Sequence, residues 1–497
     1  MLLILIPLTL LIVLTINLYR SLSKYPKGPT PLPLIGNVHQ LVFHSWKTGG
    51  VVSGLNHFRD EYGKVFTLWF GPLPAVFITD FEVAHETHVK RSNIFGTRFA
   101  VGGMTYIREG RGIVTSTGDF WQEHRRFALT TLRNFGLGRN IMEERIMAEL
   151  DYRIQDFQKT HLVNGAIEIQ AASFFDLTVG SIINRLLVSE RFEQDDEKFK
   201  KLKESLDKSL EQLSLFDLIC PIFLLKSKLL MWRTKKVFAP FEYVYELAKS
   251  TIQNRVTSIE NGEHVIEDDG TDFVDAFLVK IEKDKKEGIE STFTLDTLAI
   301  DIYDLWLAGQ ETTATTLSWA GVCLLNHPEV VSKLREELLK VTGGNRGLSL
   351  SDRPQTPYFN ATINEVQRIA SILNFNVSRC LEEDTVIDGQ PVAAGAVYTA
   401  NLSQIHTDED LFKNHKQFRP ERFLEDNSLE KKLIPFGIGK RSCPGESLAR
   451  AELYLILGNI CLNYNLEAVG EIPPIKSIAP FALMKRPPSY KIRFVPV

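Results

Sequence analysis

The sequence predicts a mainly α-helical protein with a smaller β component, preceded by a membrane anchor. Helical patterning with interleaved charges dominates residues 118–345, whereas β-rich runs and turns occupy residues 64–79 and the chain beyond about residue 380. No period of about 20 to 50 residues recurs, which excludes a repeat fold. No flexible linker divides the body, so we expect residues 38–497 to form one folded unit.

The anchor is predicted from residues 1–19, MLLILIPLTLLIVLTINLY, which carry no charged side chain. As a helix this segment would be roughly 28 Å long, close to the hydrocarbon thickness of a bilayer. A cleaved secretory signal is the alternative, but no basic segment precedes the apolar run and no small-residue cleavage site comes after it. Arg20, Lys24 and Lys27 favour the cytoplasmic side of the membrane for the body of the protein. Residues 20–37 are predicted to be a basic and proline-rich hinge.

Charge and cysteine content exclude several classes of protein. The 497 residues carry a formal net charge of −4, which argues against nucleic acid as the main partner. The five cysteines are odd in number and far apart, and no C-x-x-C motif occurs. A disulfide framework, a zinc ribbon and a cysteine-ligated iron–sulfur cluster therefore lack support, and the body is expected in a reducing compartment.

Two elements of the body are predicted in detail. Residues 64–79 are expected to form a β-hairpin around Gly71-Pro72. The longest helix is expected from about Thr294 to Asn326, ended by His327-Pro328, with a length of roughly 50 Å. This helix would cross the whole body.

The segment LAGQETT, residues 307–313, lies inside that long helix. Gly309 costs a helix interior about 1 kcal/mol relative to alanine. One interpretation is a tolerated glycine next to a solvent-facing acid. The other is a functional opening in a buried helix, with the carboxyl of Glu311 and the hydroxyl of Thr312 beside it.

A second unusual segment is FGIGKRSCPG, residues 436–445, which places three glycines, two cations and a proline around Cys443. A buried structural cysteine needs none of these neighbours. Glycines allow tight bends and a close approach of the backbone to a ligand. A helix is expected directly after Cys443, and its N-terminal dipole would stabilise a thiolate.

Three further spacings accompany this loop. WQEHR places Trp121 and Arg125 one helical turn apart, and EVQR places Glu365 and Arg368 on one helical face. FRPERF offers Arg422 in a segment expected to be irregular. Each spacing alone is weak, because E-x-x-R is usually a surface ion pair.

Together and in this order, with F-G-x-G-x-R-x-C-x-G before a helix, these motifs resemble the cytochrome P-450 superfamily of haem-thiolate monooxygenases. The resemblance covers essentially the whole chain and is greatest to the animal microsomal branch that metabolises drugs, fatty acids and other lipophiles. It implies the cytochrome P-450 fold with a long central distal helix, and a haem-binding monooxygenase domain over residues 38–497. It also implies the endoplasmic reticulum membrane as the location, with the catalytic body on the cytosolic side of a single-pass anchor.

The resemblance implies haem b as the cofactor, with Cys443 as the axial thiolate ligand of the iron. A histidine that is common in related proteins after E-x-x-R is missing from NVSRCLEED, and Arg379 is expected to replace it. Glu365, Arg368 and Arg422 match a buried structural ion triad. The expected contacts of the haem and its propionates are Arg98, Trp121, Arg125, Arg379, Phe436, Arg441 and Gly445.

The function implied is insertion of one oxygen atom from O₂ into a lipophilic substrate, which could be a xenobiotic, a fatty acid or a steroid-like compound. Electrons would come from NADPH through a flavoprotein reductase, with a cytochrome b-type donor as a further partner. A haem-thiolate isomerase and a non-catalytic haem sensor are the alternatives. Glu311 and Thr312 favour the monooxygenase as the catalytic pair, because activation of O₂ consumes protons that an acid and an alcohol can deliver.

Two surfaces are predicted, one from the placement of charges, for which a merely solvated surface is the alternative, and one from the same resemblance. Cations near the cysteine loop are expected to attract an acidic reductase; they are Arg126, Arg133, Lys431, Lys432 and Lys440. A mainly apolar pocket is expected to bind substrate, although most such residues in any protein are simply core. Its predicted lining is Phe99, Ile107, Asp304, Leu305, Ala308, Leu373 and Leu483.

Overall fold

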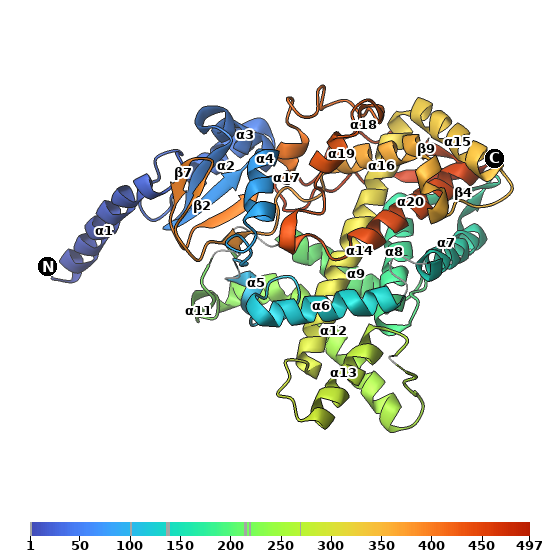
Figure 1. Ribbon diagram of the computed structural model, residues 1–497, viewed down its shortest axis with the longest axis horizontal. Helices are drawn as coiled ribbons and strands as arrows, with labels where there is room; N and C mark the ends of the chain where they lie inside the picture. The colour runs from blue at the N-terminus through green and yellow to red at the C-terminus, as the bar shows by residue number, and fades with distance from the viewer. Residues whose placement is uncertain (1, 100–101, 136–139, 213–215, 218–219, 269) are drawn as a thin grey trace.

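The computed structural model describes residues 2–99, 102–135, 140–212, 216–217, 220–268 and 270–497. Helices dominate, as predicted, and small sheets lie at two opposite sides of the body, one near its N-terminal end and one near the C-terminus (Figure 1). The first helix extends away from the body at that end (Figure 1). The N-terminal elements are α1 (Leu2–Ser21), η1 (Leu22–Lys24), α2 (Val38–Thr48), α3 (Val51–Tyr62), β1 (Val65–Phe70), β2 (Leu73–Ile78), α4 (Phe81–His85), η2 (Glu86–Lys90) and α5 (Gly103–Tyr106).

The middle of the chain supplies most of the helical core. Its elements are α6 (Gly118–Asn134), α7 (Asn140–His161), β3 (Leu162–Val163), β4 (Ala166–Gln170), α8 (Ala171–Val188), α9 (Glu197–Gln212), α11 (Ile222–Leu225), α12 (Met231–Glu260), α13 (Phe273–Glu287), α14 (Leu295–Asn326) and α15 (Pro328–Thr342).

The C-terminal third alternates helices with strands that pair either with earlier strands or with each other. Its elements are η3 (Leu350–Gln355), α16 (Pro357–Ala370), β5 (Arg379–Cys380), β6 (Thr385–Ile387), β7 (Gln390–Val392), β8 (Val397–Ala400), α17 (Leu402–His406), α18 (Arg422–Glu425), α19 (Leu429–Lys432), η4 (Gly439–Arg441), α20 (Glu446–Asn463), β9 (Tyr464–Val469) and β10 (Lys491–Pro496).

The predicted hairpin is confirmed as β1 and β2, which pair in antiparallel register from Val65 opposite Ile78 to Phe70 opposite Leu73. Gly71 makes the turn with a φ of 62°, which favours glycine. The C-terminal strand β8 joins β2 in parallel, and β5 completes a sheet of order β1-β2-β8-β5. A second sheet has the order β3-β4-β10-β9. Both sheets therefore join segments that are far apart in the sequence.

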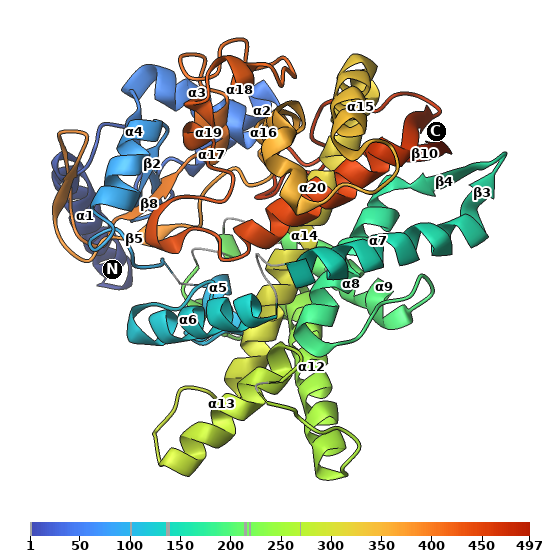
Figure 2. The same cartoon turned by 45° about the vertical axis from the view of Figure 1, so that its right-hand side comes forward.

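The long central helix is confirmed as α14, which begins and ends where the sequence predicted. The Thr294 side chain caps it by accepting a hydrogen bond of 3.1 Å from the Thr297 N–H, and His327 ends it before Pro328. It packs against α8, α12, α16 and α20, and it crosses the middle of the molecule (Figures 1 and 2). Nearly every side chain between Thr297 and Leu325 is buried. A residue of this helix that solvent can reach is therefore a candidate for the functional site.

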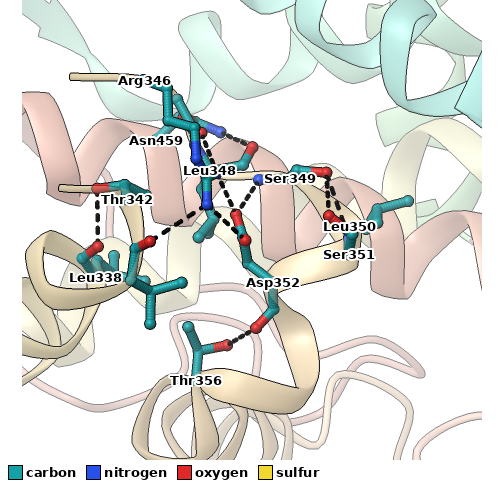
Figure 3. A network of polar contacts seen from close by, with 12 residues as sticks. Leu338, Thr342, Arg346, Leu348, Ser349, Leu350, Ser351, Asp352, Thr356 and Asn459 are labelled. Carbon is teal, nitrogen blue, oxygen red and sulfur yellow. Dashed lines mark hydrogen bonds and ion pairs between the residues drawn. The ribbon is translucent and has the colours of Figure 1, made fainter. Parts of the chain in front are cut away.

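The helix after the cysteine loop, α20, is fixed to the turn before α16 (Figure 3). Asn459 accepts a hydrogen bond of 2.8 Å from the Leu348 N–H and donates one of 3.2 Å to the Leu348 carbonyl. Asp352 accepts from the Ser349 N–H at 2.9 Å, completing a capping box, and it pairs with Arg346. These contacts hold the far end of α20 against the helical core.

Among the described residues, α8 alone is both long and apolar enough to cross a membrane, but 78% of it is buried inside the protein. It packs along α14 and belongs to the main hydrophobic core. The anchor predicted for residues 1–19 remains a prediction, since residue 1 and several side chains of α1 lie outside the described part of the chain.

Candidate active site

The loop around Cys443 is held in one conformation by its own backbone. The Cys443 N–H donates to the Phe436 carbonyl at 2.9 Å, and the Ser442 N–H donates to the Gly439 carbonyl at the same distance. Gly439 has a φ of 78°, and a Cβ there would lie 1.8 Å from the carbonyl oxygen of His88. Glycine is therefore required where this loop crosses η2.

The thiol of Cys443 has an environment unlike that of the other cysteines. It is solvent-accessible, whereas Cys220, Cys323 and Cys461 are buried and Cys380 is half-buried. The surrounding protein still displaces part of the water around the Cys443 thiol, and this desolvation raises its pKa, while the next N–H groups along the loop oppose that shift by donating to the sulfur. One of these donors belongs to Gly445, at the start of α20. Such donors stabilise a thiolate once a cation is available to bind it.

Four arginines lie around this loop, and each donates to backbone carbonyls. Arg125 Nη2 reaches the Ser442 carbonyl at 2.7 Å, directly beside Cys443. Arg441 Nε and Nη2 reach the carbonyls of Gly96 and Ser116 at 3.0 and 2.8 Å. The guanidinium of Arg441 also stacks 3.6 Å from the ring centre of Trp121.

The other two arginines complete the group from the β-rich side. Arg379 Nη1 and Nη2 donate to the carbonyls of Phe95 and Ile438 at 2.8 and 3.3 Å. Arg98 Nε and Nη1 donate to the carbonyls of Val114 and Val377 at 3.1 and 2.8 Å. We call Arg98, Arg125, Arg379 and Arg441 the arginine cluster.

The arginine cluster fits an anionic ligand. No ion pair joins its members to a carboxylate within the described part of the chain. Burial and mutual repulsion lower the pKa of Arg441 to about 9, and they hold the pKa of Arg98 well below its usual range. Arg379 Nε and Arg441 Nη1 are buried without a hydrogen-bond partner among these residues. Buried cations with free donors require a negative charge, such as that of two carboxylates.

The face of α14 that carries Thr312 is accessible. Leu305 and Thr312 are half-buried and Ala308 is exposed, although most of the helix around them is buried. Their spacing of three and then four residues places them on one face. Thr312 Oγ1 donates to the Ala308 carbonyl at 2.7 Å, so the hydroxyl lies along this open face.

Glu311, the predicted acid of the catalytic pair, points in a different direction from Thr312. Adjacent residues of an α-helix are about 100° apart around its axis. The Glu311 carboxylate is buried and lies 2.9 and 3.0 Å from Lys203 Nζ and 3.3 Å from Arg486 Nη2. Burial raises its pKa to about 7, with the carboxylates of Asp176 and Asp207 adding to the effect of burial and Lys203 opposing it. Lys203 and Arg486 are functional neighbours that no sequence spacing identified.

The predicted ion triad is formed and buried. Glu365 accepts from Arg368 Nε and Nη2 at 2.7 and 2.8 Å and from Arg422 Nε at 3.1 Å. The expectation that Arg422 lies in an irregular segment was wrong in detail, because Arg422 begins the short helix α18. Arg368 also donates to the His406 carbonyl, and His406 Nε2 accepts from the Ile434 N–H at 3.0 Å. The triad thus reaches the chain just before the cysteine loop, through a histidine that the sequence did not single out.

The predicted pocket residues come partly together. Leu373 forms a backbone bridge with Met484, and the N–H of the next residue, Asn374, donates to the Leu483 carbonyl. Leu373 and Leu483 therefore lie on adjoining segments. Ile107 and Leu305 pack at the edge of the main core, and Phe99 packs at the edge of a smaller cluster on the β1–β2 sheet.

Asp304 departs from its predicted role in lining the pocket. It is buried, accepts from Arg108 Nε at 2.7 Å and accepts from the Val114 N–H at 3.0 Å. Its carboxylate therefore fastens the segment Ile107–Val114 to α14 and is not available to a substrate. Arg108, its partner, was not identified from the sequence.

A basic groove lies beside the cysteine loop. It encloses about 330 Å³, and its cationic lining comes from Arg125, Arg126, Arg133 and Lys440. Trp121 forms part of its floor together with three uncharged residues of α6. Lys431 and Lys432, which were also predicted for this surface, lie on α19 outside the groove lining.

Comparisons with known proteins agree with this arrangement. A family model described as Cytochrome P450 matches residues 26–494. The chain is 41% identical to the probable cytochrome P450 cyp-35D1 of Caenorhabditis elegans over 500 residues, with 100% of both chains covered. It is 34% identical to cytochrome P450 2C21 of Canis lupus familiaris, with 97% of this chain and 96% of that protein covered. It is also 34% identical to cytochrome P450 2C3 of Oryctolagus cuniculus, with 96% and 95% covered.

The chain belongs to the cytochrome P450 family. It is therefore an oxidoreductase of the haem-thiolate monooxygenase class, and its cofactor is haem b with an axial cysteine thiolate. The arginine cluster and the accessible thiol fit that cofactor, since haem b carries two propionates at one edge and binds a thiolate at its iron. A redox partner and a lipophilic substrate are implied by the family in general terms.

Proposed function

We propose that Cys443 is the axial thiolate and that the arginine cluster, with the Trp121 indole, binds the two haem propionates. The observation that carries this proposal is the convergence of largely buried, carboxylate-free guanidinium groups on the cysteine loop. Arg125 and Arg379 each donate to a carbonyl of that loop, and Arg441 belongs to it. Phe436 and Gly445 begin and end the loop that carries Cys443, and both are proposed to contact the haem. When bound, the haem supplies the redox chemistry that activates O₂.

The protein's own residues then manage protons and substrate. Thr312 presents its hydroxyl on the accessible face of α14, where it can hold a proton donor close to the reacting oxygen. Glu311, whose pKa burial raises to about 7, can hold a proton near neutral pH and pass it to Thr312 when its carboxyl rotates away from Lys203 and Arg486. Leu305, Ala308 and Leu373 provide apolar surface for a lipophilic substrate, which could be a xenobiotic, a fatty acid or a steroid-like compound.

Electrons are proposed to come from NADPH through a flavoprotein reductase, with a cytochrome b-type protein as a second donor. The basic groove supports this, because its cations lie beside the cysteine loop and suit an acidic partner. The loop residue Lys440 connects the groove to Cys443.

Residues 1–19 are proposed to anchor the enzyme in the endoplasmic reticulum membrane, with residues 38–497 on the cytosolic side. The apolar run and the extension of α1 away from the body support this location (Figure 1). The basic residue in the last turn of α1, Arg20, favours a cytosolic position for the next part of the chain. The hinge of residues 20–37 separates the bilayer from the catalytic body.

The test is the absorption band of the reduced, carbon monoxide-bound protein, which is characteristic of thiolate-ligated haem. We expect wild type and the matched control Cys380→Ser to show the band, and Cys443→Ser to lose it, since a hydroxyl is a poor substitute for a soft thiolate ligand. Retention of the band in Cys443→Ser would refute the ligand assignment.

The same preparation separates the monooxygenase from the alternatives. A monooxygenase consumes NADPH and O₂ in proportion to substrate when reductase is present. A haem sensor would show the band without this consumption, and a haem-thiolate isomerase would convert substrate without NADPH or O₂.

A further inference from the structure

Two arginines of the cluster lie directly opposite each other. Arg98 and Arg379 form an antiparallel backbone bridge, which places like charges on neighbouring segments. Like charges in opposite positions destabilise a sheet unless another group compensates them. The side chain of Arg379 has no solvent exposure, so water screens its charge very little.

Within the described part of the chain, neighbouring protein groups do not supply the missing negative charge. The titratable side chains that face Arg379 are His88 and Tyr398, together with the cationic Arg98 and Arg441. Burial and the nearby arginines hold the pKa of His88 well below its usual value, so this imidazole is neutral. Burial raises the pKa of the Tyr398 hydroxyl, so it is also neutral at physiological pH. The compensation must come from the ligand.

The haem of the proposed function compensates only part of the positive charge of the arginine cluster. Ferric iron, the porphyrin dianion and one thiolate sum to zero, so the two propionates give ferric haem two negative charges. The arginine cluster carries four positive charges. One-electron reduction adds a third negative charge to the cofactor, and an excess of buried cations favours that step.

We propose that the buried guanidinium of Arg379 raises the reduction potential of the haem and so eases delivery of the first electron. Arg379 is assigned this role because its Nε has no partner among the described residues and its side chain is completely enclosed. Arg125, by contrast, is only partly buried and lies in the basic groove, where solvent screens it. The inference rests on the proposed function, and Arg379 acts as a positioning and tuning residue.

The experiment is a redox titration of the full-length holoenzyme without substrate or reductase, in wild type, Arg379→Gln and Arg379→Lys. Unit charges separated by roughly 12 Å at an effective dielectric constant of about 20 change an equilibrium constant about tenfold. We therefore expect Arg379→Gln to lower the ferrous-to-ferric equilibrium constant about tenfold, which corresponds to about 59 mV for one electron. Arg379→Lys keeps the charge and should change the constant less than about threefold.

The matched control is Arg126→Gln, which removes an exposed cation from α6 and should leave the potential unchanged because solvent screens that charge. The absorption band of the reduced, carbon monoxide-bound protein is recorded for every sample. If wild type lacks the band, the proposed function fails. If the band is present throughout and Arg379→Gln has the wild-type potential, the proposed function stands and the role of Arg379 is overturned.

Arg379→His provides a second test if the glutamine variant does not retain haem. Burial and the neighbouring arginines, which keep His88 neutral, should keep an imidazole at this position neutral as well. We therefore expect Arg379→His to have a lower reduction potential than wild type at neutral pH. A wild-type potential in Arg379→His would contradict the proposal.

Discussion

The carboxyl of Glu452 offers a direct measurement of the cost of burial in this core. Glu452 lies on α20, nine residues after the proposed haem ligand, and it is 1% exposed. Neither carboxyl oxygen has a hydrogen-bond partner among the described residues, and its polar neighbour is Thr313 of α14. Burial raises its pKa from 4.5 to about 8, so the folded protein holds a proton that the unfolded chain releases.

The direction of the effect is set by proton binding. Between the unfolded and the folded pKa of Glu452, the folded state binds more protons than the unfolded state, so this group makes the protein less stable as the pH rises. The shift implies a loss of about 3 kcal/mol between pH 5 and pH 7.5. Glutamine has nearly the same shape and no charge, so Glu452→Gln removes that loss.

The assay is thermal unfolding of the full-length protein at several pH values. For a chain of this length the unfolding entropy is about 1 kcal/mol per kelvin, so the melting temperature of Glu452→Gln should exceed that of wild type by about 3 °C at pH 7.5. At pH 5 the two should nearly coincide. The exposed carboxyl of Glu471 provides the control, since Glu471→Gln should match wild type at every pH. A constant offset between Glu452→Gln and wild type across this range would refute the reasoning.

Three further predictions concern the proposed site. Glu365→Ala should lower the free energy of unfolding by about 3–5 kcal/mol, because it leaves two buried arginines unpaired. The control Glu197→Ala removes an exposed ion pair and should cost less than about 1 kcal/mol. Denaturant unfolding of the two variants and wild type measures both effects. Thr312→Ala should keep haem and substrate binding but divert NADPH toward hydrogen peroxide, and an unchanged yield of product per NADPH would contradict its proton-handling role. Reduction by the reductase should slow as salt is added, and charge reversal at Arg126 and Lys440 should slow it at low salt; salt-independent reduction would exclude electrostatic docking.

Local patterns determined the elements that carry the site. The hairpin of β1 and β2 and both ends of α14 were predictable, because turn and capping residues act on their immediate neighbours in the chain. The cysteine loop was recognisable for the same reason, since its glycines and its thiol occupy one short segment. The ion triad was partly predictable from spacing, because Glu365 and Arg368 lie one turn apart on α16.

Tertiary structure decided the contacts of these residues. The partners of Glu311 come from α9 and from the C-terminal segment, more than 100 residues away in either direction, and they turn its carboxyl away from Thr312. Asp304 likewise pairs with Arg108 across the core. No local pattern encodes such pairs, because a buried charge takes whichever opposite charge the packing of distant elements brings within reach.

In the arginine cluster, too, some residues were identified from the sequence, whereas their contacts were decided by the fold. Trp121 and Arg125 were linked by helical spacing, and Arg441 by its place beside Cys443. The bridge between Arg98 and Arg379 exists only because the C-terminal chain returns to pair beside the N-terminal sheet. The sequence by itself determined that the chain carries a cysteine loop with cations typical of a haem site, whereas the fold decided how much positive charge gathers around that loop, since charge density depends on distances between segments far apart in the chain.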